Sequence, residues 1–230
     1  MNLGLSIPMY NEEGNAERVV IRIVSHLERL NIDFLLAVVN NGSSDGTGTI
    51  LDKLSEADAR IVPIHLQRNQ GYGGGIMAGV NALLIKEPDI IGWIWGDGQV
   101  CSTVLSTLYT ECANGTDLAK TCRIQRQDGY LRRCISTVYS INMRTLMRVR
   151  TPDINGCPKL FRREFFSQLQ LESKDWFLDA EAILKTEKKQ GIIHNEPVIM
   201  EARTSGKSNV RMATIVEFLS NMIRWKMKRY

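Results

Sequence analysis

Residues 34–55, FLLAVVNNGSSDGTGTILDKLS, contain the repeating unit that decides the fold. An apolar run is followed by a polar turn and then by a segment with helical spacing. Apolar runs at 3–8, 61–66 and 90–96 are followed in the same way by helical patterns at 15–30, 74–86 and 103–113. Apolar strands that alternate with helices at this spacing predict an α/β fold, with a mostly parallel sheet flanked by helices.

Polar residues follow each predicted strand. In open α/β sheets, ligands bind beyond the carboxyl ends of the strands. We therefore expect the four polar loops to form one site along a single edge of the sheet. They are residues 8–13, 40–47, 68–75 and 96–99.

The second half of the chain has a less regular pattern. A basic stretch at 120–136 leads into a helix that ends near Val149. A turn, a short strand and a helix start follow at 154–166, then a helix at 176–191 and a strand at 192–202. Residues 212–229 have apolar residues at a helical period on one face. We predict one domain over residues 1–210 and a basic amphipathic C-terminal helix over 211–230.

The amino-acid composition limits the classes of protein to which the chain can belong. The chain has 230 residues, is 43% hydrophobic and carries a net charge of +4. It contains no apolar run long enough to span a bilayer and no signal peptide pattern, so we expect a cytoplasmic protein. Five cysteines without a C-x-x-C pair argue against a disulfide framework. We expect no nucleic-acid partner.

The charge is unevenly distributed. From Arg203 to the C-terminus there are seven basic residues and one acid, so this segment carries +6 and the remainder carries −2. A basic tail on a near-neutral body indicates an anionic partner for the tail.

The loops after the strands contain groups suited to a nucleotide and a metal ion. Polar side chains at 40–45 suit a base and a ribose, although an Asn-Gly turn with a helix cap explains them equally well. Gly73 and Gly74 allow the close backbone approach that a diphosphate requires. Asp97 and Gln99 lie at i and i+2, so both oxygens can face one point, and such oxygen ligands suit Mg²⁺ or Mn²⁺.

Seven segments together resemble, in order and spacing, the inverting nucleotide-sugar glycosyltransferases of the GT-A fold. They look most like the dolichyl-phosphate mannosyltransferase and polyprenyl-phosphate glycosyltransferase branch. The segments are IPMYNEE (7–13), VVNNGSSDGT (38–47), GYGGGIMAG (71–79), GDGQ (96–99), KLFRREFF (159–166), DAEAILK (179–185) and RTSGKSN (203–209).

The resemblance implies roles for individual residues. It places Pro8, Tyr10 and Glu12 at the nucleotide, and Val39 and Asn41 at the ribose and base. Asp97 and Gln99 match the end of the family's metal-binding Asp-Ala-Asp-x-Gln. For the acceptor phosphate it implies Arg123, Arg132 and Ser136, and near the diphosphate it implies Arg203 and Lys207.

The chain departs from the family pattern at three places. The usual Asp-Asp-Gly-Ser is Asn40-Asn41-Gly42-Ser43, the first acid of Asp-Ala-Asp is Trp95, and the last lysine of the C-terminal element is Asn209. One negative ligand fewer should lower the affinity for the metal. An inactive regulatory subunit that keeps the fold is therefore an alternative to an enzyme.

Two classes of acceptor are compatible with the sequence. A phosphate monoester is already a nucleophilic anion at pH 7 and needs cations to position it, as the basic cluster at 123–133 could do. A sugar hydroxyl needs a carboxylate base, for which Asp179 is the candidate. Asp179 could instead stabilise the first turn of its helix.

The C-terminal pattern favours a lipid acceptor. Trp225 lies among apolar residues beside Arg224, Lys226, Lys228 and Arg229. This pattern suits an anionic membrane surface, and packing of the helix on its own domain or on a second copy is the alternative. The leading prediction is a metal-assisted transfer of a sugar to a polyprenyl phosphate, by a protein that is peripheral on the cytoplasmic face of a membrane. Transfer to a glycan hydroxyl is the alternative.

Overall fold

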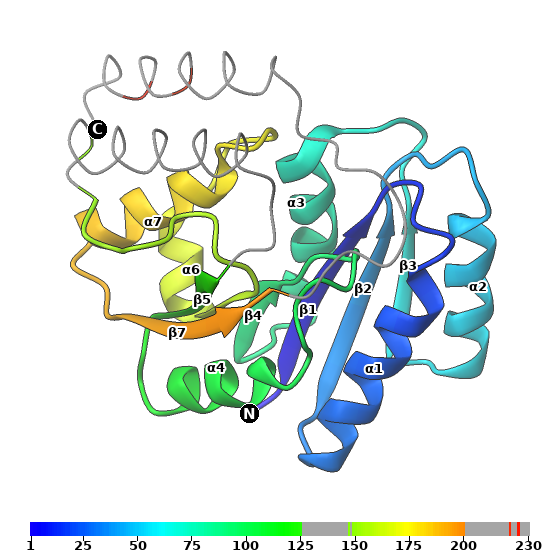
Figure 1. Cartoon of the computed structure of the whole chain (residues 1–230), viewed down its shortest axis with the longest axis horizontal. Coiled ribbons are helices and arrows are strands. Elements are labelled where there is room, and N and C mark those ends of the chain that lie inside the picture. The colour runs from blue at the N-terminus through cyan, green and yellow to red at the C-terminus, as the bar shows by residue number, and fades with distance from the viewer. Residues whose placement is uncertain (126–146, 148, 201–220, 222–224, 226–230) are drawn as a thin grey trace.

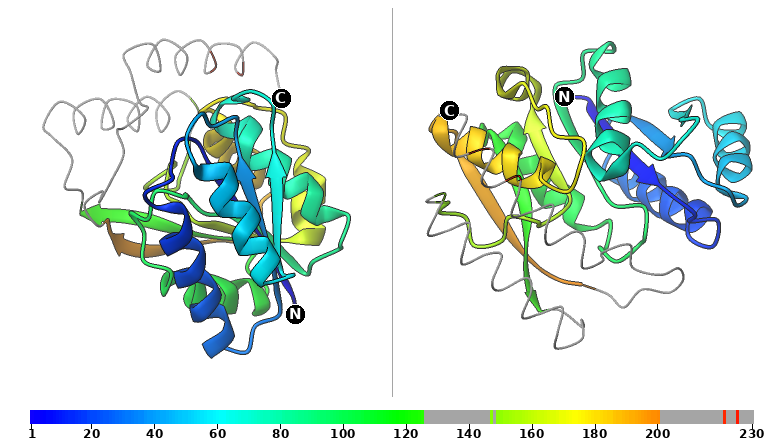
Figure 2. Two further views of the ribbon diagram at one scale, coloured as in Figure 1. Left: turned by 90° about the vertical axis from the view of Figure 1, so that its right-hand side faces the viewer. Right: turned by 90° about the horizontal axis from the view of Figure 1, so that it is seen from above.

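The computed structural model describes residues 1–125, 147, 149–200, 221 and 225. In this part of the chain, a central sheet has helices on both faces (Figures 1 and 2). The elements are β1 (Leu3–Met9), α1 (Ala16–Arg29), β2 (Phe34–Asn40), α2 (Thr47–Ala57), β3 (Ile61–His65), α3 (Gly71–Leu84), β4 (Ile90–Trp93), α4 (Val104–Ala113), β5 (Leu118–Gln125), β6 (Lys159–Arg162), α6 (Arg163–Leu169), α7 (Leu178–Lys188) and β7 (Ile193–Ile199).

The sheet order is β3-β2-β1-β4-β6-β5-β7. Strands β3, β2, β1 and β4 are parallel, and β5 is parallel to β7. Strand β6 runs antiparallel to both of its neighbours, β4 and β5. The prediction of a mostly parallel sheet flanked by helices is therefore confirmed.

Alternation along β1 shows how the two faces of the sheet are built. Leu3, Leu5 and Ile7 belong to the core that α1, α2 and α4 cover. Ser6 faces the opposite side, where its hydroxyl donates to the carbonyl of Ile76 in α3 over 3.0 Å. Since small residues alternate with large ones in β1, α3 can pack close to the sheet. The second core lies under α3, α6 and α7.

The structure differs from the sequence prediction at β4 and β5. The predicted strand at 90–96 ends at Trp93, where the register with β6 also ends. Strand β5 occupies part of the stretch that the sequence pattern indicated only as basic. It carries Lys120, a buried lysine that breaks the apolar run by which a central strand is recognised.

The predicted boundary at residue 210 and most of the predicted C-terminal helix lie outside the described residues. Two residues of this segment are placed. Asn221 donates to Asp175 Oδ2 over 2.7 Å, and the Trp225 ring lies 5.8 Å from that of Phe177. At these two positions the segment contacts its own domain, which was one of the alternatives for it.

Candidate active site

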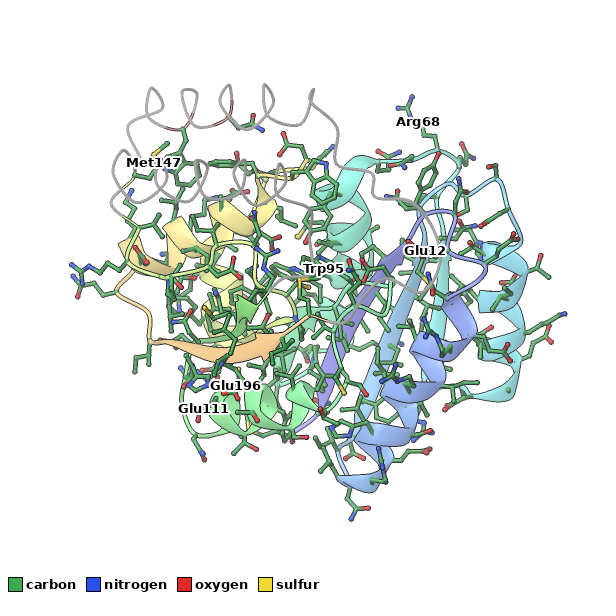
Figure 3. All side chains as sticks on the ribbon, in the orientation of Figure 1. Glu12, Arg68, Trp95, Glu111, Met147 and Glu196 are labelled. Atoms are coloured by element: carbon green, nitrogen blue, oxygen red, sulfur yellow. The ribbon has the colours of Figure 1, made fainter. Side chains whose placement is uncertain are left out.

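The loops after β1 and β2 are joined by hydrogen bonds. Glu12 N–H donates to Thr47 Oγ1 over 2.9 Å, and Asn11 N–H donates to Ser43 Oγ over 3.0 Å. The Glu12 carboxylate accepts from Asn15 Nδ2 over 2.6 Å. Figure 3 shows Glu12 near the carboxyl end of β1. Neighbouring parallel strands thus bring these two predicted nucleotide-binding loops together.

Pro8 and Val39 are paired residues of β1 and β2. Val39 is fully buried as a whole residue, backbone included. Pro8 is partly buried, and Tyr10 follows directly after the strand. Their roles at the nucleotide stay predictions.

Asn41 connects the β2 loop to the start of α3. Its Oδ1 accepts from Gln70 N–H, and its Nδ2 donates to the carbonyl of Gly71, both over 2.9 Å. The side chain is nearly buried. A carboxylate at this position could not donate to Gly71, so the amide suits the loop that it holds.

Gly73 and Gly74 pack against the chain that precedes α7. Gly74 N–H donates to the carbonyl of Lys174 over 2.8 Å. A Cβ on Gly73 would lie 2.6 Å from the carbonyl oxygen of Ser173. In the structure, the backbone of residues 173–175 approaches these two glycines closely. The contact of Gly73 and Gly74 with a diphosphate stays a prediction.

Asp97 and Gln99 lie in one tight turn after β4. Gln99 N–H donates to Asp97 Oδ1 over 3.1 Å, and Gly98 between them has φ +70°, which favours glycine. Arg18 of α1 lies against this turn, because a Cβ on Gly98 would be 3.2 Å from its Nη2. The same Nη2 donates to Asn15 Oδ1 over 2.8 Å. The structure therefore adds a cation beside the predicted metal ligands.

The donor set at Asp97 is small for a divalent cation. Over the residues that the structure describes, no cluster of three or more His, Cys, Asp or Glu side chains could hold a metal ion. One carboxylate and one amide oxygen are suitable hard ligands for Mg²⁺ or Mn²⁺, but they leave most of the coordination to waters and to the ligand's own oxygens. By donor type, these two residues suit a metal that would bind together with a diphosphate, and their role as its ligands stays a prediction.

Trp95, which stands where the family has its first acid, is held by Tyr72 of α3. The indole Nε1–H donates to the Tyr72 hydroxyl over 2.8 Å. That hydroxyl donates to Asp179 Oδ2, also over 2.8 Å. Burial, and secondarily the negative charge of Asp179, raise the pKa of Tyr72 well above its ordinary value, so its proton stays in place.

Asp179, the candidate base, is buried in an ion pair. Its Oδ1 lies 2.6 Å from Lys159 Nζ, and its Oδ2 accepts from Tyr72. The side chains of Lys159 and Asp179 are 0% and 3% exposed. Both carboxylate oxygens are thus bonded within the protein, and the use of Asp179 as a general base stays a prediction.

Arg123 has a carboxylate partner that the sequence did not indicate. Its Nε and Nη2 donate to the two oxygens of Asp153, each over 2.7 Å, and both side chains are largely buried. Burial alone would raise the pKa of Asp153, but the bonds and charge of Arg123 outweigh it and hold this pKa far below its usual range. The pair fixes the orientation of the guanidinium, and its predicted contact with an acceptor phosphate stays a prediction.

Other predicted site residues lie outside the described residues. They are Arg132 and Ser136 of the predicted acceptor loop, and Arg203 and Lys207 of the predicted diphosphate element.

Four residues that the structure ties to the site carry little signal in the sequence: Arg18, Tyr72, Asp153 and Lys159. Of these, only Lys159 could have been recognised from the sequence, because a charged residue within the apolar segment CPKLF indicates a buried ion pair. The others become recognisable only when distant segments are brought together.

Comparison with known proteins identifies the family and the fold that this chain resembles. The family model described as glycosyl transferase family 2 matches residues 5–170. A curated relative, undecaprenyl-phosphate 4-deoxy-4-formamido-L-arabinose transferase of Proteus mirabilis, is 28% identical over 175 residues, which is 75% of this chain and 52% of the relative. The chain thus spans about half the length of that protein.

Solved structures give the same fold. Glucosyl-3-phosphoglycerate synthase from Mycobacterium tuberculosis, in complex with phosphoglyceric acid, aligns with a TM-score of 0.73 at 16% identity, over 97% of this chain and 79% of that one. Mannosyltransferase PcManGT from Pyrobaculum calidifontis, in complex with GDP-Man and Mn²⁺, aligns with a TM-score of 0.65 at 15% identity, over 97% and 64%. The fold is the GT-A fold that the resemblance implied.

Among the helices in the described part of the chain, none combines the length and apolar character that a bilayer span requires.

Proposed function

Because the chain belongs to glycosyl transferase family 2, we propose that it transfers a sugar from a nucleotide-diphosphate sugar to a polyprenyl phosphate. The observation that carries this proposal is the family match over residues 5–170, which contain all four loops at the edge of the sheet. The name of the Proteus mirabilis relative, which refers to undecaprenyl phosphate, supports the class of acceptor.

The donor would lie across the loops after β1, β2, β3 and β4. Pro8, Tyr10, Glu12 and the backbone near Val39 and Asn41 would hold the nucleoside. Gly73 and Gly74 would lie near the diphosphate. Arg18 would add positive charge there, since its guanidinium lies against the turn that carries Asp97.

Asp97 and Gln99 would hold Mg²⁺ or Mn²⁺ together with the donor's diphosphate. When bound, the ion would supply positive charge that stabilises the leaving diphosphate. A neighbour of the same fold was crystallised with GDP-Man and Mn²⁺, which supports this part of the proposal. Arg203 and Lys207 would add to the same charge.

A phosphate acceptor has to be oriented by the protein but does not have to be deprotonated by it. A phosphate monoester is a nucleophile at pH 7 without a base, so a buried and doubly bonded Asp179 is no obstacle to its attack. Arg123, with Arg132 and Ser136, would position this phosphate near the anomeric carbon. The alternative of transfer to a glycan hydroxyl is disfavoured, because its candidate base is neutralised by Lys159.

The basic C-terminal segment would bring the protein to the membrane that holds the lipid acceptor. Trp225 contacts Phe177 and lies 6.0 Å from Lys185 Nζ, so the proposed membrane contact rests on the basic side chains and not on this indole.

The deciding experiment is a transfer assay with purified protein, undecaprenyl phosphate, Mn²⁺ and a panel of labelled UDP- and GDP-sugars. We expect label in the lipid fraction with at least one donor. Asp97→Asn should abolish it, and Asp33→Asn, which changes an exposed acid, should not. Label in a glycan acceptor instead would establish the hydroxyl alternative. No transfer with any donor, including with a membrane lipid extract, would point to an inactive subunit.

A further inference from the structure

Trp95 lies at the point where the candidate donor site meets the buried core. It follows β4 and precedes Asp97 by two residues, and its side chain is partly buried (Figure 3). One part of the ring packs against the core under α3 and α7. Where the family pattern has a small carboxylate, this chain has a large neutral indole. The shape and the charge of the site therefore both differ from the family pattern.

The ring of Trp95 is held by a chain of directed bonds. An indole N–H can only donate, so Tyr72 must accept from Trp95 and use its own proton for Asp179. Lys159 neutralises Asp179 at the end of the chain. Tyr72 is itself stacked on Trp176, with ring centroids 4.4 Å apart and planes 10° apart. The orientation of the indole is therefore fixed before any ligand binds.

A second contact constrains Trp95 from β5. The guanidinium carbon of Arg123 lies 5.9 Å from the centre of its ring, within the range of a cation–π interaction. Arg123 is in turn oriented by both oxygens of Asp153. Two buried ion pairs thus orient one partly exposed aromatic ring: Asp179–Lys159 acts through Tyr72, and Arg123–Asp153 acts directly.

We propose that Trp95 is a specificity-determining residue whose ring forms a wall of the donor site and packs on the apolar face of the transferred sugar. This inference rests on the proposed function and concerns the same site. The sugar is bonded to the diphosphate that Asp97 would meet, and Trp95 is two residues from Asp97 along the chain. A neutral ring cannot pair with a sugar hydroxyl as a carboxylate does, but it can cover C–H groups.

Isothermal titration can separate the sugar contact from the nucleotide contacts. UDP, UDP-glucose, GDP and GDP-mannose are titrated with Mn²⁺ into the wild type and into Trp95→Ala, Trp95→Phe and Tyr72→Phe. The quantity of interest is the ratio of the affinity for the nucleotide sugar to the affinity for the matching nucleoside diphosphate. Trp225→Phe is the control, because it alters an indole that packs elsewhere.

We expect Trp95→Ala to lower this ratio at least tenfold while affinity for the nucleoside diphosphate changes less than twofold. Trp95→Phe keeps an aromatic face and should restore most of the ratio. Tyr72→Phe keeps a ring beside Trp176 but loses both hydrogen bonds, and should lower the ratio by a smaller factor. If Trp95→Ala fails to fold, Trp95→Leu, which keeps apolar bulk without an aromatic face, is compared with Trp95→Phe instead, and it should lower the ratio while Trp95→Phe keeps most of it.

Two negative outcomes are distinguishable. An equal loss for nucleotide sugar and nucleoside diphosphate, or no loss for either, would overturn the role of Trp95 and leave the proposed function standing. Failure of the wild type to bind any of the four ligands would overturn the donor half of the proposed function and this inference with it.

Discussion

Asp179 is the buried counterion of Lys159, with Oδ1 and Nζ only 2.6 Å apart. The two residues come from α7 and β6, so the pair joins the helix layer to the one antiparallel strand among the described strands of the sheet. Lys159 also donates to the carbonyl of Gly156 over 2.7 Å. The carboxylate that resembles a catalytic base in the sequence is thus part of the scaffold that orients Tyr72 and Trp95.

Asp179→Asn should destabilise the protein by about 3 kcal/mol, because it leaves the charge of Lys159 buried without a counterion. Adding Lys159→Met should recover most of this loss, since no charge then stays buried. Urea unfolding of the wild type, both single variants and the double variant gives the coupling energy directly.

The same double variant tests catalysis. If Asp179 and Lys159 serve only the structure, kcat should fall less than tenfold in the double variant. Loss of a general base would instead lower kcat by about 10²–10⁴-fold. A fall of the larger size would restore the hydroxyl-acceptor alternative.

Asp153→Asn should cost about 3 kcal/mol at pH 7, because it leaves Arg123 without its bidentate partner. The native pKa of Asp153 is lowered, so the stability that this group contributes is present above its unfolded pKa, near 4, and is lost as the pH falls toward its native value. The difference between variant and wild type should therefore shrink from pH 7 to about pH 3. Chemical denaturation at both pH values measures it, with Asp33→Asn as the control, and a difference independent of pH would contradict the assignment.

Lys120→Met should stabilise the protein at pH 7. The lysine is fully buried, its Nζ donates to the carbonyl of Thr121, and burial followed by the charge of Lys159 lowers its pKa to about 8. Holding the charged form in the fold therefore costs up to about 3 kcal/mol below pH 8. Methionine has a similar volume without this cost.

The advantage of Lys120→Met should depend on pH in a defined direction. Between about pH 8 and the ordinary lysine value of about 10.5, the unfolded chain binds the proton that the native state has released, so the wild type gains stability as the pH rises. The gap between variant and wild type should narrow from pH 7 to pH 10. A constant gap would mean that Lys120 is paired in a way that keeps its charge.

Trp95→Asp should raise the affinity for Mn²⁺ in the presence of a nucleoside diphosphate by about tenfold, since it adds a negative ligand near Asp97. Asp97→Asn should lower that affinity by at least as much. Calorimetric titration of Mn²⁺ with and without UDP checks both variants. Equal affinity in the wild type and Trp95→Asp would show that position 95 does not reach the metal.

Replacing Arg224, Lys226, Lys228 and Arg229 by Gln should remove most binding to anionic vesicles. At about 1 kcal/mol for each basic residue, the four contribute roughly 4 kcal/mol at modest salt. Co-sedimentation with vesicles that contain phosphatidylglycerol measures the effect. Binding should also be weak to zwitterionic vesicles and at about 0.5 M salt, where the Debye length is only a few ångström. Retention of binding by the variant would locate the membrane contact elsewhere.

Much of the fold could be predicted because buried positions in strands and helices are occupied by apolar residues at a regular spacing. The apolar runs of β1 to β4 and the helices between them follow the alternation that a doubly covered sheet requires. Strand β5 escaped prediction because Lys120 and Arg123 made it resemble a solvated stretch, whereas both side chains are buried or nearly so. The spacing of apolar residues shows which positions are buried. It gives no information on charged residues that are buried as ion pairs.

The sequence by itself determined the order of the strands along the chain, the four loops at one edge and the candidate ligands Asp97 and Gln99. Only the tertiary structure decided the partners of the charged and aromatic groups. Arg123 meets Asp153 thirty positions away, and Tyr72 meets Asp179 over a separation of 107. The physical reason is that a hydrogen bond or an ion pair depends on distance and direction in space, which the spacing of residues along the chain does not encode.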